Sequence, residues 1–82
     1  MTEAEIYDRL QNVFNEVFRR QDIKLTPSLT AADVPGWDSF RYISLIMATE
    51  KHFRMKLQGP DIDDLKNIGD LVRAVASKVL QN

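Results

Sequence analysis

The sequence contains no cysteine and a single histidine, His52, in 82 residues. Disulfide bonds and thiolate metal sites are therefore excluded, and His52 has no second histidine or cysteine with which to share a metal ion. We expect no metal site and place His52 at the surface. Any thiol chemistry would have to come from a bound cofactor. Since no Ser/His/carboxylate set is evident either, we expect a protein that is not an enzyme.

Long apolar runs are also missing. The longest lies within Leu45–Ala48, far short of the roughly 20 residues that a membrane-spanning helix needs. Because Met1–Glu5 includes neither a basic nor an apolar region, we expect no secretory signal and predict a cytoplasmic protein without membrane insertion. The formal net charge of −1 lacks the basic excess that binds nucleic acid, so no nucleic-acid partner is expected.

Glycine and proline are scarce, at three each, and no Gly/Pro/Ser-rich linker divides the chain. We therefore expect a single domain over residues 1–82. No segment shows the sustained alternation of apolar and polar residues that marks a strand, whereas three segments repeat apolar residues at helical spacing. The sequence predicts an all-α fold: a small four-helix bundle with three longer helices, one short helix and a long first loop.

The first helix is signalled by Thr2 and Glu5, which fit a capping box. A long connection follows at about Gln21–Trp37, in which Thr30–Asp33 is expected to form one helical turn. Loops longer than about 12–15 residues are uncommon in compact domains and tend to be functional. The expected apolar face of the first helix comprises Ile6, Leu10, Val13, Phe14, Val17 and Phe18.

The second helix is expected to begin at Asp38 or Ser39, with Asp38 as a good N-cap, and to end near Phe53–Arg54. Its apolar residues are numerous enough that we expect it to be the most buried helix. They are Phe40, Tyr42, Ile43, Leu45, Ile46 and Met47.

A short helical turn is expected over Ile62–Leu65, and Asn67 is expected to cap the last helix, with Asp70 as its capping partner. The apolar face of that helix comprises Ile68, Leu71, Val72, Val75 and Val79.

The segment Gly36–Phe40 places a serine hydroxyl at the start of a helix and at the end of a long loop. Helix N-termini have free N–H groups and a partial positive charge, so they accept phosphate well. A phosphodiester on Ser39 would lie in a favourable field, and Asp38 could orient the hydroxyl or help a modifying enzyme to position its metal ion. Asp-Ser before an apolar helix is also a common cap, so the pair alone fits either a cap or a modification site.

The run Gly36–Phe53 resembles the Asp-Ser-Leu helix of acyl carrier proteins. In that family the modified serine is followed by a large apolar residue, an aliphatic pair and a Glu-x-x-Phe ending, which Glu50 and Phe53 supply here. The resemblance covers nearly the whole chain and implies a four-helix bundle of the acyl-carrier type. It continues through Leu57, Ile62, Leu65, Ile68 and Leu71.

The resemblance implies that Ser39 carries a 4′-phosphopantetheine arm, with Asp38 as the flanking residue of the motif. The arm would hold an acyl or aminoacyl group as a thioester, and the bundle interior would shelter this cargo. The implied partners are a phosphopantetheinyl transferase that uses coenzyme A, an acyl- or aminoacyl-loading ligase, and a downstream synthase or transferase. We expect a monomer, since no exposed heptad seam is evident.

Several positions depart from the family pattern. Phe40 replaces the usual leucine, as in carriers of D-alanine for cell-wall polymers, which keeps an aminoacyl cargo open. Arg41, Ser44 and Lys51 stand where fatty-acid-synthesis carriers usually have acidic residues, so we expect a carrier dedicated to a specialised pathway. Trp37 either flanks the arm or a partner, or packs the loop on the helix start. The expected partner-binding residues are Trp37, Phe40, Arg41, Ser44, Met47 and Lys51.

A different class of function also fits the residues. An unmodified helical adaptor could bind a partner through the second helix, with Ser39 serving only as a cap. A helix-turn-helix DNA-binding protein fits less well, because a long proline-containing loop stands where a tight turn would be required.

Overall fold

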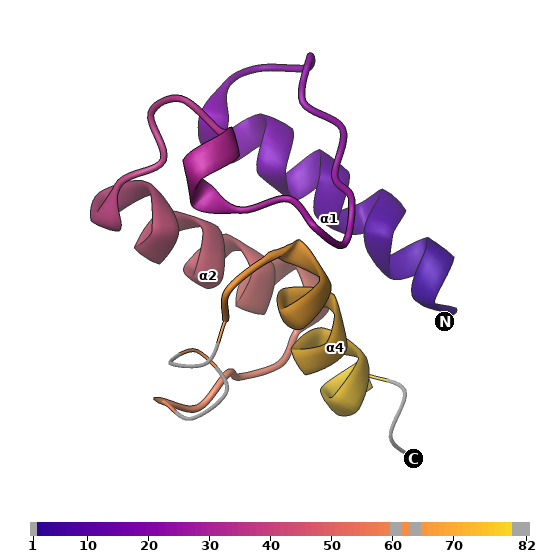
Figure 1. The fold of residues 1–82 in the computed structure, drawn as a ribbon. Helices are drawn as coiled ribbons and strands as arrows, with labels where there is room; N and C mark the ends of the chain where they lie inside the picture. The colour runs from indigo at the N-terminus through magenta and orange to yellow at the C-terminus, as the bar shows by residue number, and fades with distance from the viewer. Residues whose placement is uncertain (1, 60–61, 63–64, 80–82) are drawn as a thin grey trace.

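The computed structural model describes residues 2–59, 62 and 65–79. Within these residues lie the α-helices α1 (Glu3–Phe18), α2 (Ser39–Phe53) and α4 (Ile68–Val79), and the short 3₁₀ helix η1 (Ala31–Asp33) (Figure 1). The described residues include no strand. The expected all-α fold is confirmed. Helix α1 packs against both α2 and α4. No helix in the described part of the chain is long and apolar enough to cross a membrane.

Helix α1 begins with the capping box that the sequence predicts. The Thr2 hydroxyl accepts the N–H of Glu5 at 3.2 Å, and the Glu5 carboxylate accepts the N–H of Thr2 at 3.1 Å. The hydrogen bond from the Thr2 backbone lowers the pKa of Glu5. The predicted apolar face of α1 forms the centre of the core, where Ile6, Leu10 and Phe14 are fully buried.

The orientation of α2 differs from the expectation, and it is not the most buried helix. Four of its 15 residues are buried, against five of the 12 residues of α4. Phe40, Ile43 and Met47, three of the apolar residues from which we expected a largely buried helix, are 74%, 58% and 63% exposed. The physical reason is that α2 has apolar residues on more than one side, and a small bundle can cover only one of them. Its buried residues are Leu45, Ile46, Thr49 and Phe53.

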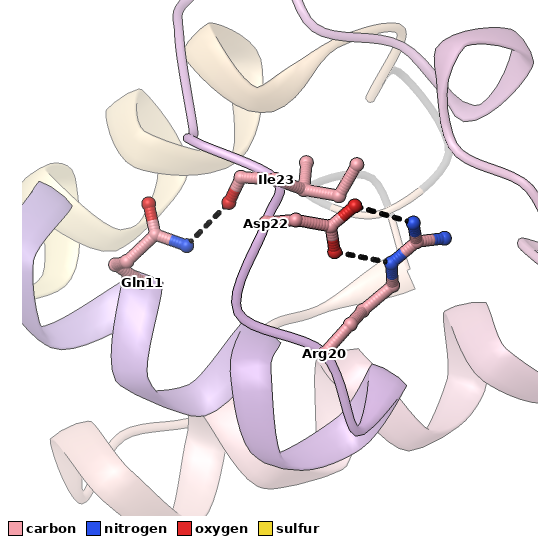
Figure 2. A network of polar contacts seen from close by, with 4 residues as sticks. All are labelled: Gln11, Arg20, Asp22 and Ile23. Carbon is pink, nitrogen blue, oxygen red and sulfur yellow. Dashed lines mark hydrogen bonds and ion pairs between the residues drawn. The ribbon is translucent and has the colours of Figure 1, made fainter.

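The long first loop is held against the bundle by both apolar and polar contacts. Leu25 and Val34 are buried in the core. The Gln11 amide of α1 donates to the Ile23 carbonyl at 2.8 Å (Figure 2). The same amide accepts the Leu25 N–H at 2.9 Å. Polar backbone groups of a packed loop need such partners. The turn expected at Thr30–Asp33 is confirmed as η1, with a capping box between those two residues.

The same loop also contacts the first turn of α4. Ile68 N–H donates to the Leu29 carbonyl at 2.9 Å, and Gly69 N–H donates to the Pro27 carbonyl at 3.0 Å. These loop carbonyls satisfy N–H groups that have no partner within the helix. Gly69 is buried, and a Cβ at this position would lie 3.0 Å from the Pro27 carbonyl oxygen. The loop and the start of α4 therefore fix each other in position.

The predicted cap of α4 is also present. The Asn67 side chain accepts the Asp70 N–H at 2.8 Å. The Asp70 carboxylate accepts the Lys66 N–H at 3.0 Å, one residue before the cap, and this hydrogen bond lowers the pKa of Asp70.

The short helix expected over Ile62–Leu65 includes residues 63 and 64, which lie outside the described residues. At its two ends, Ile62 N–H donates to the Gln58 carbonyl and Leu65 N–H donates to the Ile62 carbonyl, both at 3.2 Å. The Tyr42 hydroxyl of α2 donates to the Ile62 carbonyl at 3.0 Å, which ties this segment to α2.

Candidate functional site

The candidate site lies at the N-terminus of α2, where two adjacent residues have separate roles. Asp38 is the N-cap: its carboxylate accepts the Arg41 N–H at 2.8 Å, and its carbonyl accepts the Tyr42 N–H at 2.9 Å. Ser39 is the first helical residue and is exposed. Among the residues that the structure describes, none forms a hydrogen bond with the Ser39 hydroxyl. Because the cap is Asp38, the interpretation of Ser39 as the cap is wrong.

The chain that leads into the site is held by a short series of turns. Val34 is buried, its N–H donates to the Ala31 carbonyl at 3.2 Å, and its carbonyl accepts the Trp37 N–H at 3.2 Å. Gly36 between them has a φ of +85°, a left-handed conformation that glycine adopts at little cost. The turn therefore delivers Ser39 to the surface from a buried anchor.

Trp37 gives this turn its firm contact with α1. Its ring lies 6.0 Å from the Phe14 ring in an edge-on arrangement and 5.4 Å from the Phe18 ring. Such aromatic contacts stabilise beyond simple burial. Trp37 therefore packs the loop onto the C-terminal half of α1 rather than onto the start of α2, and its role beside the arm or a partner stays a prediction.

A cleft of about 390 Å³ opens beside Ser39, between the start of α2 and the start of α4. Its walls are largely apolar and include the rings of Trp37 and Tyr42 and the side chains of Leu65 and Leu71. A group attached to the Ser39 oxygen would therefore have an apolar surface next to it.

The electrostatic environment of Ser39 favours a negative charge. The N-terminal end of α2 carries the positive end of the helix dipole, and Lys66 is part of the cleft wall. The carboxylate of the adjacent Asp38 is already hydrogen bonded to the Arg41 N–H. A phosphodiester on Ser39 therefore fits the residues present. Within residues 2–59, 62 and 65–79, no cluster of three His, Cys, Asp or Glu residues could hold a metal ion.

The six residues expected to bind partners fall into two groups. Phe40, Met47 and Lys51 are exposed on α2. The other three have internal contacts or are half-buried. Trp37 packs on α1, and Ser44 is half-buried. The Arg41 guanidinium donates to the carbonyl of Val17, at the end of α1, at 2.5 Å.

Two residues of this region were missed by the sequence argument. Ile43, which we placed in the core, lies on the exposed side of α2 together with Phe40 and Met47. Tyr42, expected only as one of the apolar residues that bury the second helix, forms part of the cleft wall. The exposed side of α2 could have been predicted from Phe53. Residues four and seven positions before it, Thr49 and Ile46, lie on the same side of the helix and are buried with it.

Comparison with known proteins gives one consistent result. No protein-family model matches the chain. It is 24% identical over 75 residues to the acyl carrier protein of Thermotoga maritima, covering 92% of this chain and 93% of that protein. It is 27% identical over 77 residues to the acyl carrier protein of Lactobacillus johnsonii, covering 94% and 96%.

A solved structure is more similar in sequence than either of these proteins. The solution NMR structure of holo acyl carrier protein from Geobacter metallireducens has a TM-score of 0.86 and 35% identity to this chain. The match covers 92% of this chain and 86% of the other. The similarity therefore extends over nearly the full length of both molecules.

Proposed function

Because the chain belongs to the acyl carrier protein family, we propose that Ser39 is the attachment site of a 4′-phosphopantetheine arm on which an acyl or aminoacyl group is carried as a thioester. Members of this family are carriers rather than enzymes. The arm supplies the thiol that the cysteine-free chain lacks. The role of the chain is to bear the arm and to present its cargo to partner enzymes.

The observation that carries the proposal is the exposed hydroxyl of Ser39, which has no hydrogen-bond partner among the described residues. A transferase needs a nucleophile that it can reach, and Ser39 is exposed at the first position of α2. Since Asp38 caps the helix, modification of Ser39 would not disrupt the cap. The positive end of the helix dipole and Lys66 would both stabilise the phosphodiester.

The apolar cleft beside Ser39 gives the cargo a surface on which to shelter. Trp37, Tyr42, Leu65 and Leu71 would exclude water from the part of the cargo that enters. We propose this as the way in which the carrier protects its load from hydrolysis.

Intact-protein mass spectrometry after incubation with coenzyme A and a promiscuous phosphopantetheinyl transferase tests the proposal. The unmodified chain should gain the mass of one phosphopantetheine, and Ser39→Ala should gain none. Ser28→Ala is the matched control, because Ser28 is also an exposed serine but lies in the first loop. This control should be modified like the parent. Modification of Ser39→Ala would place the arm elsewhere, and an unmodified parent would favour the helical adaptor.

Phe40 directly after Ser39 favours an aminoacyl cargo as the second candidate. Mass spectrometry of the material released from the thioester, on protein purified from its own host, distinguishes an amino acid from an acyl chain. The partners that we propose are the transferase, an acyl- or aminoacyl-loading ligase, and a synthase or transferase of a specialised pathway. A cytoplasmic monomer is part of the same proposal.

A further inference from the structure

Helix α2 presents a stripe of three apolar side chains that the described chain leaves uncovered. Phe40 is 74%, Ile43 58% and Met47 63% exposed. Residues spaced by three and four positions lie on one side of a helix, so these side chains form one line along α2. A contiguous apolar patch on a small protein is typical of an interaction site. We call these three residues the apolar stripe.

The apolar stripe ends in a basic groove at the C-terminal end of α2. The groove has a volume of about 450 Å³, and its walls include Met47, Met55 and three cationic side chains. These are Lys51, Arg54 and Lys56, all of which are exposed. In the described part of the chain, no ion pair engages any of the three. We call them the basic margin.

The acidic residue of the groove does not neutralise the basic margin. The Glu50 carboxylate is half-buried and accepts the Leu57 N–H at 2.8 Å, which fixes its direction. Residues 39–58 contain four arginines and lysines against this one acidic residue, whereas the formal net charge of the chain is −1. The positive charge is therefore a local property of α2 and the turn that follows it.

We propose that the partner enzyme which docks on α2 presents carboxylates to the basic margin, beside an apolar pocket for the apolar stripe. The inference rests on the proposed function, because an enzyme that handles the cargo must reach Ser39, which directly precedes Phe40. A protein is favoured over an anionic membrane because the chain as a whole is slightly negative and, among the residues that the structure describes, only three large apolar side chains are exposed. Complementary charge would set the choice of partner and the rate of encounter.

Binding of designed peptides to the unmodified chain tests the inference directly. The first probe is an amphipathic helical peptide with a leucine face and a glutamate margin, and the second has lysine in place of each glutamate. By NMR titration at low salt, the glutamate peptide should bind at least about tenfold more tightly and shift the amides of residues 40–56. Equal binding of both peptides, or shifts confined to α1, would overturn the inference.

Charge-reversal variants connect the binding to particular residues. The double variant Lys51→Glu/Lys56→Glu should lose the preference for the glutamate peptide. Lys24→Glu is the control, because Lys24 is an exposed lysine of the first loop and lies far along the chain from α2. This variant should bind as the parent does. Vesicles of phosphatidylcholine and phosphatidylserine serve as the membrane probe, and their binding through the basic margin would overturn the choice of a protein partner.

Cargo loading provides the test in the biological setting. Chains that already bear the arm, as checked by intact mass, are incubated with host extract, and the fraction loaded is followed by mass spectrometry. Loading of the double variant should be slower by about tenfold at low salt, and that of Lys24→Glu should be unchanged. Equal loading rates for the double variant and the parent would overturn the inference and leave the proposed function intact. Failure of the chain to gain the arm would count against the proposed function alone, since the peptide test needs no arm.

Discussion

At the first turn of α2, capping and accessibility for modification belong to different residues, Asp38 and Ser39. From the sequence alone, Ser39 fitted either a cap or a modification site. The Asp38 carboxylate is held by the Arg41 N–H, whereas the Ser39 hydroxyl has no partner in the described part of the chain. A residue that caps a helix is constrained in direction, and a residue that is to be modified must be accessible. Placing the two roles on neighbouring residues meets both requirements.

This division makes a prediction about stability. Asp38→Ala should lower the free energy of unfolding by about 1 kcal/mol, because it removes the acceptor of the Arg41 N–H. Asp38→Asn should lower it by a few tenths of a kcal/mol at most, since asparagine caps nearly as well as aspartate. Urea denaturation followed by circular dichroism measures both changes. A larger loss for Ser39→Ala than for Asp38→Ala would show that the assignment of the cap is reversed.

At the scale of elements, the junction between the first loop and α4 requires a glycine, Gly69, because there is no room for a side chain. Gly69 N–H donates to the Pro27 carbonyl, and a Cβ on Gly69 would lie 3.0 Å from that carbonyl oxygen and 3.3 Å from the Asn67 side-chain oxygen. We expect Gly69→Ala to destabilise the chain by roughly 1–3 kcal/mol, because the gain in helix propensity is smaller than the cost of the displaced backbone.

The matched control is Gly59→Ala, since a Cβ at Gly59 would meet no atom within 4 Å. The free energy of unfolding of this variant should stay within about 0.5 kcal/mol of the parent. Thermal and urea denaturation of the two variants side by side check the comparison. An unchanged free energy of unfolding for Gly69→Ala would mean that the Pro27 carbonyl moves aside at little cost. The loop would then not be fixed by α4.

The elements also show how far the sequence alone can lead. The caps at Thr2, Asp38 and Asn67 were predictable because each depends on neighbours within three residues. The orientation of α2 was not, because Phe40 and Leu45 are both apolar and the choice between them depends on what packs against the helix. The cleft was missed for a similar reason: it brings Ser39 close to residues of the distant α4, and spacing along the chain carries no information on that contact.

For the molecule as a whole, a small core means that one large buried side chain carries much of the stability. Phe14 is fully buried, stacks on Phe18 with ring centres 4.3 Å apart, and contacts Trp37 next to the candidate site. Phe14→Ala should cost about 3–5 kcal/mol, which equals roughly the whole 3–5 kcal/mol that a core of this size supplies.

We therefore expect Phe14→Ala to be largely unfolded at 25 °C by circular dichroism and to lose modification by the transferase together with its fold. Phe40→Ala removes a side chain of the same size, but one that is 74% exposed, and should change the free energy of unfolding by less than about 0.5 kcal/mol. Since both variants delete the same phenyl ring, the difference between them measures the burial and ring contacts of Phe14 rather than the size of the side chain. Equal losses in stability would mean that α2 turns its other face to the core, and the apolar stripe would then not be available to a partner.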